Sequence, residues 1–150
     1  MPLYRDYIRV PYASTVHGEE EIEAVVNVLK TSTQMSKNVE IFEKKIAKIF
    51  DHNYGVMVNS GSSALYLLIE SLNLKKKSEV ITPALTFATT VGSLVKNGLI
   101  PRFVDVKPNT FCADISKIEE AINDKTSAIC APDLMGNICE WDEIRKLANK

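Results

Sequence analysis

The chain has 150 residues, of which 45% are hydrophobic and 25% charged, the balance of a globular protein with a real core. Its formal net charge of −1 argues against binding to nucleic acid or to an anionic membrane surface. The sequence contains no apolar run of membrane-spanning length, and its first residues lack the apolar core of a signal peptide. The odd number of cysteines without C-x-x-C spacing predicts reduced thiols in a cytoplasmic protein, and the two separated histidines predict no protein-ligated metal.

The first third of the chain is predicted to be helical after an extended arm. Residues 1–17 show no period, whereas hydrophobic spacing predicts helices over residues 19–30 and 39–50 with a polar loop between them. The stripe of the first helix consists of Ile22, Val25, Val26 and Leu29.

From residue 54 onward, short apolar strands alternate with helices. The strands are expected at residues 54–58, 79–81, 100–106 and 126–131, and the helices at 62–72, 87–97, 116–123 and 141–150. Gly98 is placed to close the second of these helices, and either Asp114 or a Ser116…Glu119 capping box starts the third. The alternation predicts an α/β fold with a mostly parallel sheet and helices on both faces.

Ligands of such sheets bind beyond the carboxyl ends of the strands. The candidate ends are residues 59–63, 82–87, 105–110 and 132–137. Because the last helix has no glycine or proline stop and an α/β domain normally continues into a further strand, we expect the front part of a longer protein or a natural truncation.

The stretch Asn59-Ser-Gly-Ser-Ser63 is predicted to join a strand to a helix, which places free backbone N–H groups and the positive end of the helix dipole at its turn. Gly61 would let the backbone turn and approach a ligand, and Ser62 and Ser63 would add hydroxyl donors. This pattern favours a phosphate site, although it is neither a P-loop nor a dinucleotide fingerprint. An ordinary turn with a serine N-cap is the alternative.

Five blocks in this order resemble the DegT/DnrJ/EryC1/StrS family, which comprises pyridoxal-phosphate (PLP) sugar aminotransferases and relatives of fold type I. Asn59–Leu65 is similar to the family's N-S-G-[TS]-S-A-L turn, and Glu79–Thr90 to its E-V-I-x-P-x-x-T-[FW] block. Pro101–Val106 resembles P-x-F-V-D-V, Ile118–Ile129 resembles I-E-x-A-I-x-x-x-T-x-A-I, and Gly136-Asn137 stands where the family has Gly-[Gln/Asn].

The resemblance implies that PLP or pyridoxamine phosphate (PMP) is the cofactor, with its phosphate on Gly61, Ser62 and Ser63. It also implies that Phe87 stacks on the pyridine ring and that Asn137 lies beside the ring. Without the resemblance, Phe87 reads as a core residue and Asn137 as a turn residue.

The resemblance further implies a domain plan. Residues 1–53 would form an N-terminal arm and helices, and residues 54–150 the first part of a PLP-binding domain truncated at its C-terminus. The family's pyridine-nitrogen aspartate and Schiff-base lysine have no matching position in this sequence, so no catalytic residue is assigned, and the chain alone is not expected to catalyse transamination.

The implied function is the N-terminal portion of a PLP-dependent aminotransferase acting on a nucleotide-linked keto-deoxysugar, in lipopolysaccharide, other cell-surface polysaccharide or secondary-metabolite biosynthesis. Glutamate would be the amino donor, and the full-length enzyme would be a homodimer. A nucleotide-sugar 3-dehydratase of the same fold is an alternative, which Asn137 after Gly136 and Asn97-Gly-Leu-Ile-Pro101 favour. Two departures, Asp133-Leu-Met-Gly-Asn137 where the family has His-Leu-x-Gly-Gln and Met35-Ser36 where it has Thr-x-Gly, argue against assigning a sugar-binding wall. A catalytically inert remnant and a Rossmann-like nucleotide-binding domain complete the alternatives, the last disfavoured by the missing fingerprint.

Overall fold

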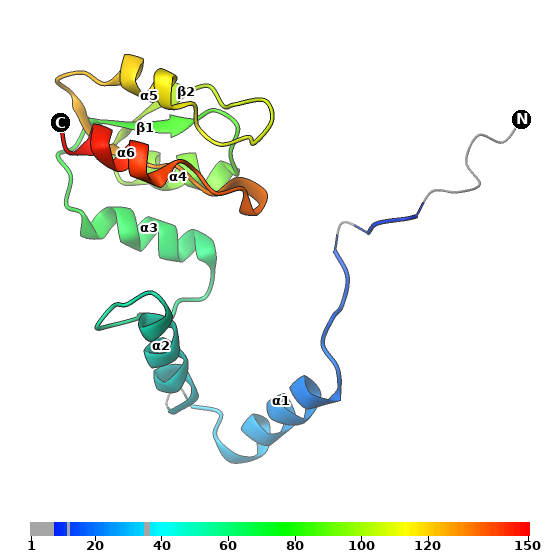
Figure 1. Cartoon of the computed structure of the whole chain (residues 1–150). Coiled ribbons are helices and arrows are strands. Elements are labelled where there is room, and N and C mark those ends of the chain that lie inside the picture. The colour runs from blue at the N-terminus through cyan, green and yellow to red at the C-terminus, as the bar shows by residue number, and fades with distance from the viewer. Residues whose placement is uncertain (1–7, 12, 35–36) are drawn as a thin grey trace, which may run out of the picture. The chain divides into compact units, whose positions relative to one another are not determined.

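The computed structural model describes residues 8–11, 13–34 and 37–150. The chain forms two compact units, residues 1–56 and 57–150, and the helices with β1 and β2 are labelled in Figure 1. Met35-Ser36, one of the departures from the family pattern, lies outside the described residues. The proposed assignment of residues 1–53 and 54–150 to an arm with helices and to a PLP-binding domain stays a prediction.

The first unit contains the two predicted helices, α1 (Glu19–Thr31) and α2 (Lys37–Ile49). Three glutamates open α1 at the positive end of its dipole, and the Gly18 amide donates to Glu21 Oε2 at 2.7 Å. None of the residues of α1 is buried, and its apolar stripe is exposed throughout, with Leu29 at 67%. Periodicity and end charges therefore predict this helix correctly, although its stripe does not form a core within the described unit.

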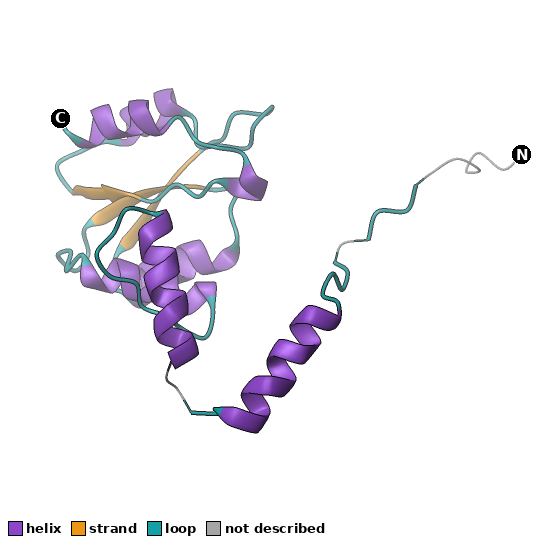
Figure 2. Ribbon diagram, turned by 60° about the horizontal axis from the view of Figure 1, so that its bottom comes forward, coloured by secondary structure: helices purple, strands orange, loops and turns teal. Residues whose placement is uncertain are grey.

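The second unit is an α/β fold. Its helices are α3 (Gly61–Ser71), α4 (Ala88–Lys96), α5 (Ile115–Ala121) and α6 (Trp141–Ala148), its strands are β1 (Glu79–Pro83), β2 (Ile100–Val104) and β3 (Thr126–Ile129), and a 3-10 turn spans Leu134–Gly136. The strands form a parallel sheet in the order β2-β1-β3. Helices lie on both sides of these strands in Figure 2, as predicted.

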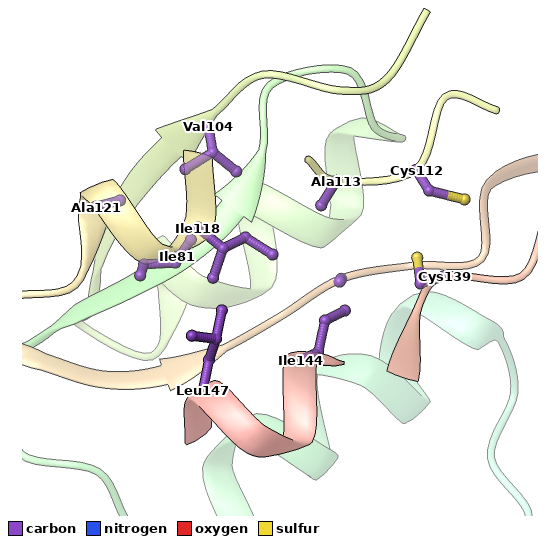
Figure 3. Close-up of a cluster of buried hydrophobic side chains, with 10 residues drawn as sticks. Ile81, Val104, Cys112, Ala113, Ile118, Ala121, Cys139, Ile144 and Leu147 are labelled. Carbon is purple, nitrogen blue, oxygen red and sulfur yellow. The ribbon is translucent and has the colours of Figure 1, made fainter. Parts of the chain in front are cut away.

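Alternating side chains of β1 supply the two cores. Val80 packs with Ile69 of α3 and Leu94 of α4 on one face of the sheet. On the opposite face, Ile81 packs with residues of α5 and α6, including Ile118, which is fully buried (Figure 3). Because successive side chains of a strand point to opposite faces, one short apolar strand holds helices on both sides.

The predicted strand at residues 54–58 is wrong. No strand is assigned in this segment, and Tyr54 and Val56 are 89% and 80% exposed. A strand exists only through hydrogen bonds to a neighbour, and in the described part of the chain no segment pairs with this one, since β2 and β3 flank β1. The apolar sequence therefore could not show whether a neighbouring strand would pair with this segment.

Two local predictions are confirmed. Gly98 closes α4 with φ of +73°, a conformation that favours glycine. Asp114 is the N-cap of α5, because its Oδ1 accepts from the Ser116 amide at 2.9 Å and from the Ser116 hydroxyl at 2.7 Å, which decides against the Ser116…Glu119 capping box.

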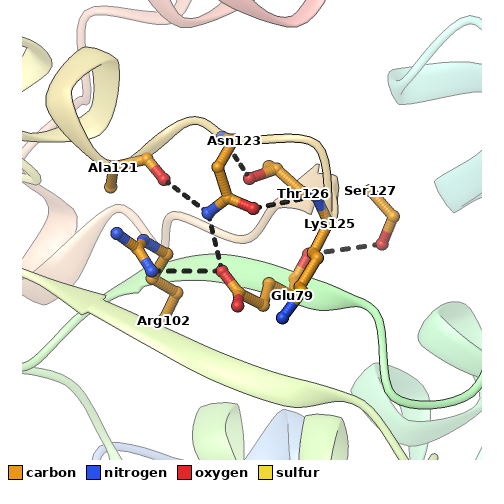
Figure 4. Close-up of polar contacts among 7 residues, drawn as sticks. All are labelled: Glu79, Arg102, Ala121, Asn123, Lys125, Thr126 and Ser127. Carbon is orange, nitrogen blue, oxygen red and sulfur yellow. Dashed lines mark hydrogen bonds and ion pairs between the residues drawn. The ribbon is translucent and has the colours of Figure 1, made fainter.

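A polar network at the amino end of the sheet joins the three strands (Figure 4). Glu79 Oε2 of β1 accepts from Arg102 Nη1 of β2 at 3.2 Å and from Asn123 Nδ2, before β3, at 2.8 Å. The Asn123 hydrogen bond, followed by the Arg102 charge, lowers the pKa of Glu79. Ser78 and Ser127 share a further hydrogen bond of 2.8 Å. These contacts tie the three strands together at the end of the sheet opposite the candidate site.

Candidate functional site

Ser60 is the serine that caps α3. Its backbone is extended, its Oγ accepts from the Ser63 amide at 3.2 Å, and its carbonyl accepts from the Ala64 amide at 3.0 Å. The Ser60 hydroxyl in turn donates to Ser63 Oγ at 3.2 Å. The Ser63 amide, predicted as a phosphate donor, is therefore occupied, whereas the Ser63 hydroxyl keeps its own proton to donate.

Two amides at this helix end remain available. The N–H groups of Gly61 and Ser62 donate to no described residue, and neither does the Ser62 hydroxyl. Both residues are exposed at the positive end of the α3 dipole. Gly61 is not among the residues with positive φ, and a Cβ added to it would meet no atom within 4 Å, so the turn itself does not require glycine. The expected close approach of a ligand to Gly61 stays a prediction.

A hollow of about 240 Å³ adjoins these donors. We call it the α3–α4 hollow, and its lining consists of Ser62, Ser63 and Tyr66 from α3 and Thr89, Gly92, Ser93 and Lys96 from α4. Ser62 and Thr89 come from the first turns of their helices, so the two positive helix ends open into one space. Sequence reasoning missed Ser93 and Lys96, because the groove between two helices is set by their packing.

Phe87 is the N-cap residue of α4, directly beyond the carboxyl end of β1. Its side chain is 70% exposed, so the alternative interpretation as a core residue is wrong. An exposed aromatic face at this edge of the sheet is available to stack on a flat ligand. Thr86 and Thr90 on either side bond each other at 3.0 Å between their hydroxyl oxygens.

Asn137 follows the 3-10 turn after β3, and its side chain is exposed. Its amide donates to the Leu134 carbonyl at 3.0 Å, and its carbonyl accepts from Cys112 Sγ at 3.3 Å. Met135 and Gly136 before it have φ of 55° and 80°. Because β1 and β3 are neighbouring parallel strands, Phe87 and Asn137 lie along the same carboxyl edge of the sheet.

The loop of residues 132–140 is held by a carboxylate. Asp133 Oδ1 accepts from the Cys139 amide at 2.8 Å and from Trp141 Nε1 at 3.1 Å. The Cys139 amide is the main cause that lowers the pKa of Asp133. The carboxylate ties the beginning of the loop to its end, an arrangement for which the sequence carried no recognised motif.

Two thiols and an ion pair complete this restraint. Cys139 Sγ donates to the Pro132 carbonyl at 3.4 Å, and burial, then Cys112, raises the pKa of Cys139 to about 12. Cys112 and Cys139 lie at one end of the buried cluster in Figure 3. Lys107 Nζ pairs with Glu140 Oε2 at 2.5 Å, and this hydrogen bond raises the pKa of Lys107. The segment after β2 and the loop after β3 are thereby joined.

Neither a metal cluster nor a membrane-spanning helix occurs among the described residues. No group of three or more His, Cys, Asp or Glu side chains among them could hold a metal ion. Within the same residues, every helix is too short or too polar to cross a bilayer.

The parallel sheet with helices on both faces and free donors at its carboxyl edge defines the class of α/β proteins that bind ligands at this edge. Within that class, the chain belongs to the DegT/DnrJ/EryC1/StrS aminotransferase family, whose profile matches residues 15–150. The fold is the N-terminal part of the fold-type-I architecture.

Relatives with different chemistry resemble the chain. It is 38% identical over 147 residues to GDP-4-keto-6-deoxy-D-mannose 3-dehydratase of Yersinia pseudotuberculosis, covering 93% of this chain and 37% of the relative. It is 31% identical over 153 residues to 3-oxo-glucose-6-phosphate:glutamate aminotransferase of Bacillus subtilis, and the match covers 97% of this chain and 35% of that relative. The E. coli GDP-4-keto-6-deoxy-D-mannose-3-dehydratase structure with bound hydrated PLP superposes with a TM-score of 0.88 at 38% identity. The match covers 96% of this chain and 39% of the dehydratase chain. The chain thus spans little more than a third of these relatives.

Proposed function

We propose that the chain is the N-terminal portion of a PLP- or PMP-dependent enzyme acting on a nucleotide-linked keto-deoxysugar, and that it holds the phosphate of the coenzyme. The observation that carries this proposal is the pair of free amides on Gly61 and Ser62 at the α3 N-terminus. Family membership and the PLP-bound relative support the same ligand. We also propose a cytoplasmic homodimer for the whole enzyme.

The residues present fit a phosphorylated pyridine. The Gly61 and Ser62 amides and the Ser62 and Ser63 hydroxyls would bind the phosphate, and their geometry needs no rearrangement because the helix end orients them. The open space beside Gly61 leaves room for the phosphate to approach the backbone. Phe87 would cover one face of the ring and exclude water, and Asn137 would donate from its side-chain amide to a ring substituent.

When bound, the coenzyme supplies an electron sink for bonds broken at the substrate. The described residues would bind and orient it, whereas the positions of the family's lysine and aspartate have no counterpart among these 150 residues. No residue of the chain is therefore assigned a catalytic role. Mixed with PLP and borohydride, the chain should acquire no specific covalent label at a single lysine, and such a label would contradict this assignment.

Two reactions are candidates for the whole enzyme. Amino transfer from glutamate is the first, as in the aminotransferase relative. Removal of a sugar hydroxyl is the second, and the higher identity to the 3-dehydratase favours it, 38% against 31%. Products formed from a GDP-linked 4-keto-6-deoxysugar and glutamate by the whole enzyme would decide, since one reaction gives an amino sugar and the other a deoxygenated sugar.

Calorimetric titration with PMP tests the phosphate site. PMP carries no aldehyde, so lysines cannot capture it covalently, and pyridoxamine is the matched ligand without phosphate. We expect PMP to bind more tightly than pyridoxamine, and Ser62→Ala to weaken PMP binding by about three- to tenfold through loss of a charge-assisted donor. Ser71→Ala, at the far end of the same helix, should bind as the wild type does. Equal binding of the two ligands, or equal effects of the two substitutions, would overturn the proposal.

A further inference from the structure

The α3–α4 hollow extends from the proposed phosphate donors along the groove between the two helices. Its lining contains hydroxyl, backbone and aromatic groups and one cation, and no acidic residue contributes to it. The volume of about 240 Å³ is large against the ~30 Å³ that a water molecule occupies in the liquid, so a phosphate group fits inside. The hollow is thus suited in size and charge to an anion.

The hydroxyl of a buried residue, Ser93, reaches this hollow. Ser93 is only 6% exposed, and its Oγ makes no hydrogen bond to a described residue. Its carbonyl, by contrast, is used twice, by the Asn97 amide at 3.2 Å and by Asn97 Nδ2 at 2.9 Å. Because Ser93 is mostly buried while its hydroxyl reaches the wall of the hollow without a described partner, this hydroxyl is available to a ligand atom there.

Lys96 supplies the charge. Its Nζ lies 4.4 Å from the centroid of the Tyr66 ring, and it forms no ion pair with a described acidic residue. The contact with Tyr66 keeps the ammonium group at the hollow while leaving its positive charge without a counterion there. The N-terminal end of α3 adds its partial positive charge to the same space.

We propose that the α3–α4 hollow binds a phosphate group as a dianion, with Lys96 as counter-charge and the Ser93 and Ser62 hydroxyls as donors. The bound group is either the phosphate of the coenzyme or that of a second phosphorylated ligand, because the chemistry of recognition is shared. Only the first source rests on the proposed function. Lys96 would then act as a binding residue, a role separate from the catalytic lysine that the family places elsewhere.

Amide chemical shifts of the ¹⁵N-labelled chain, titrated with inorganic phosphate against chloride at constant ionic strength, test this proposal. We expect shifts at Ser62, Ser63 and Ser93, and we expect Lys96→Met to weaken phosphate binding about tenfold or more. Lys96→Arg, which keeps the charge, should bind as the wild type does. Lys75→Met is the matched control, because it removes the same charge from the same unit outside the hollow.

A second arm adds PMP to the phosphate-saturated chain. Competition identifies the coenzyme's phosphate as the occupant, and independent binding identifies a second phosphorylated ligand, so each result supports the site. Equal phosphate affinity of Lys96→Met and Lys75→Met overturns the inference, and PMP binding that still depends on Ser62 would then leave the proposed function intact. If phosphate binding depends on Lys96 and PMP does not bind, the inference about the hollow is supported and the proposed function is contradicted. Unchanged amide shifts around Ile118, on the opposite face of the sheet, verify that the variants are folded.

Discussion

The two sides of the candidate site are built in different ways. At the α3 N-terminus, the Gly61 and Ser62 amides are free because every helix leaves its first N–H groups without partners. In the 132–140 loop, the Asn137 backbone is bonded on both sides and Asp133 spans the loop. A helix end therefore offers oriented donors by its geometry alone, whereas a loop must be tied down before it can present a side chain.

Removal of the Asp133 carboxylate should give the largest effect on stability. Asp133→Ala takes the acceptor away from the Cys139 amide and from Trp141 Nε1, and we expect the free energy of unfolding to fall by about 1–2 kcal/mol. Urea unfolding followed by the fluorescence of Trp141, the single tryptophan, measures it. Asp124→Ala, a carboxylate with no hydrogen bond to a described residue, is the control, and an equal loss there would show that the loop is not held by Asp133.

Ser60 and Ser62 should separate stability from binding at the other side. Ser60→Ala removes the cap, so we expect about 1 kcal/mol less stability with PMP affinity retained. Ser62→Ala should show the opposite pattern, with stability retained and affinity lowered, since its hydroxyl bonds no described residue. Thermal unfolding and calorimetry on the same two variants provide the comparison. A joint loss of both quantities in either variant would show that the cap and the binding donors are not separate.

The smallest effect is expected on acidification. Because the pKa of Asp133 is lowered in the folded chain, its contribution to stability is complete above the ordinary carboxyl pKa near 3.8 and is lost as the pH falls through the lower folded value. The Trp141 fluorescence should therefore change below about pH 4, where protonation weakens the bond to Nε1. Asp133→Asn should not show this acid transition, and a curve identical to that of the wild type would contradict the assignment.

Local physics explains what the sequence could predict. Hydrophobic periodicity predicted the helices and the three paired strands, and the helix-end position of Gly61 and Ser62 followed from the start of the helical pattern after Asn59. The choice among neighbouring serines did not follow, because each could cap, and only the backbone of Ser60 places its hydroxyl on the Ser63 amide.

Long-range contacts could not be predicted. Cys112 and Asn137 are 25 residues apart, and their bond exists only because the segments after β2 and β3 meet. The segment of residues 54–58 failed as a strand for the same reason, since pairing depends on a neighbour that periodicity does not report. The groove that exposes Lys96 to the α3–α4 hollow likewise arises from helix packing.

The Glu79 network has a consequence for how this chain tolerates change. Its carboxylate receives Arg102 and Asn123 at the amino end of the sheet, so some of the contacts that align the strands lie away from the candidate site. Substitutions of exposed side chains beyond β1 and β3, such as Phe87 and Asn137, leave these contacts in place. Side chains at the carboxyl end can therefore change specificity while the amino end of the sheet keeps its own contacts.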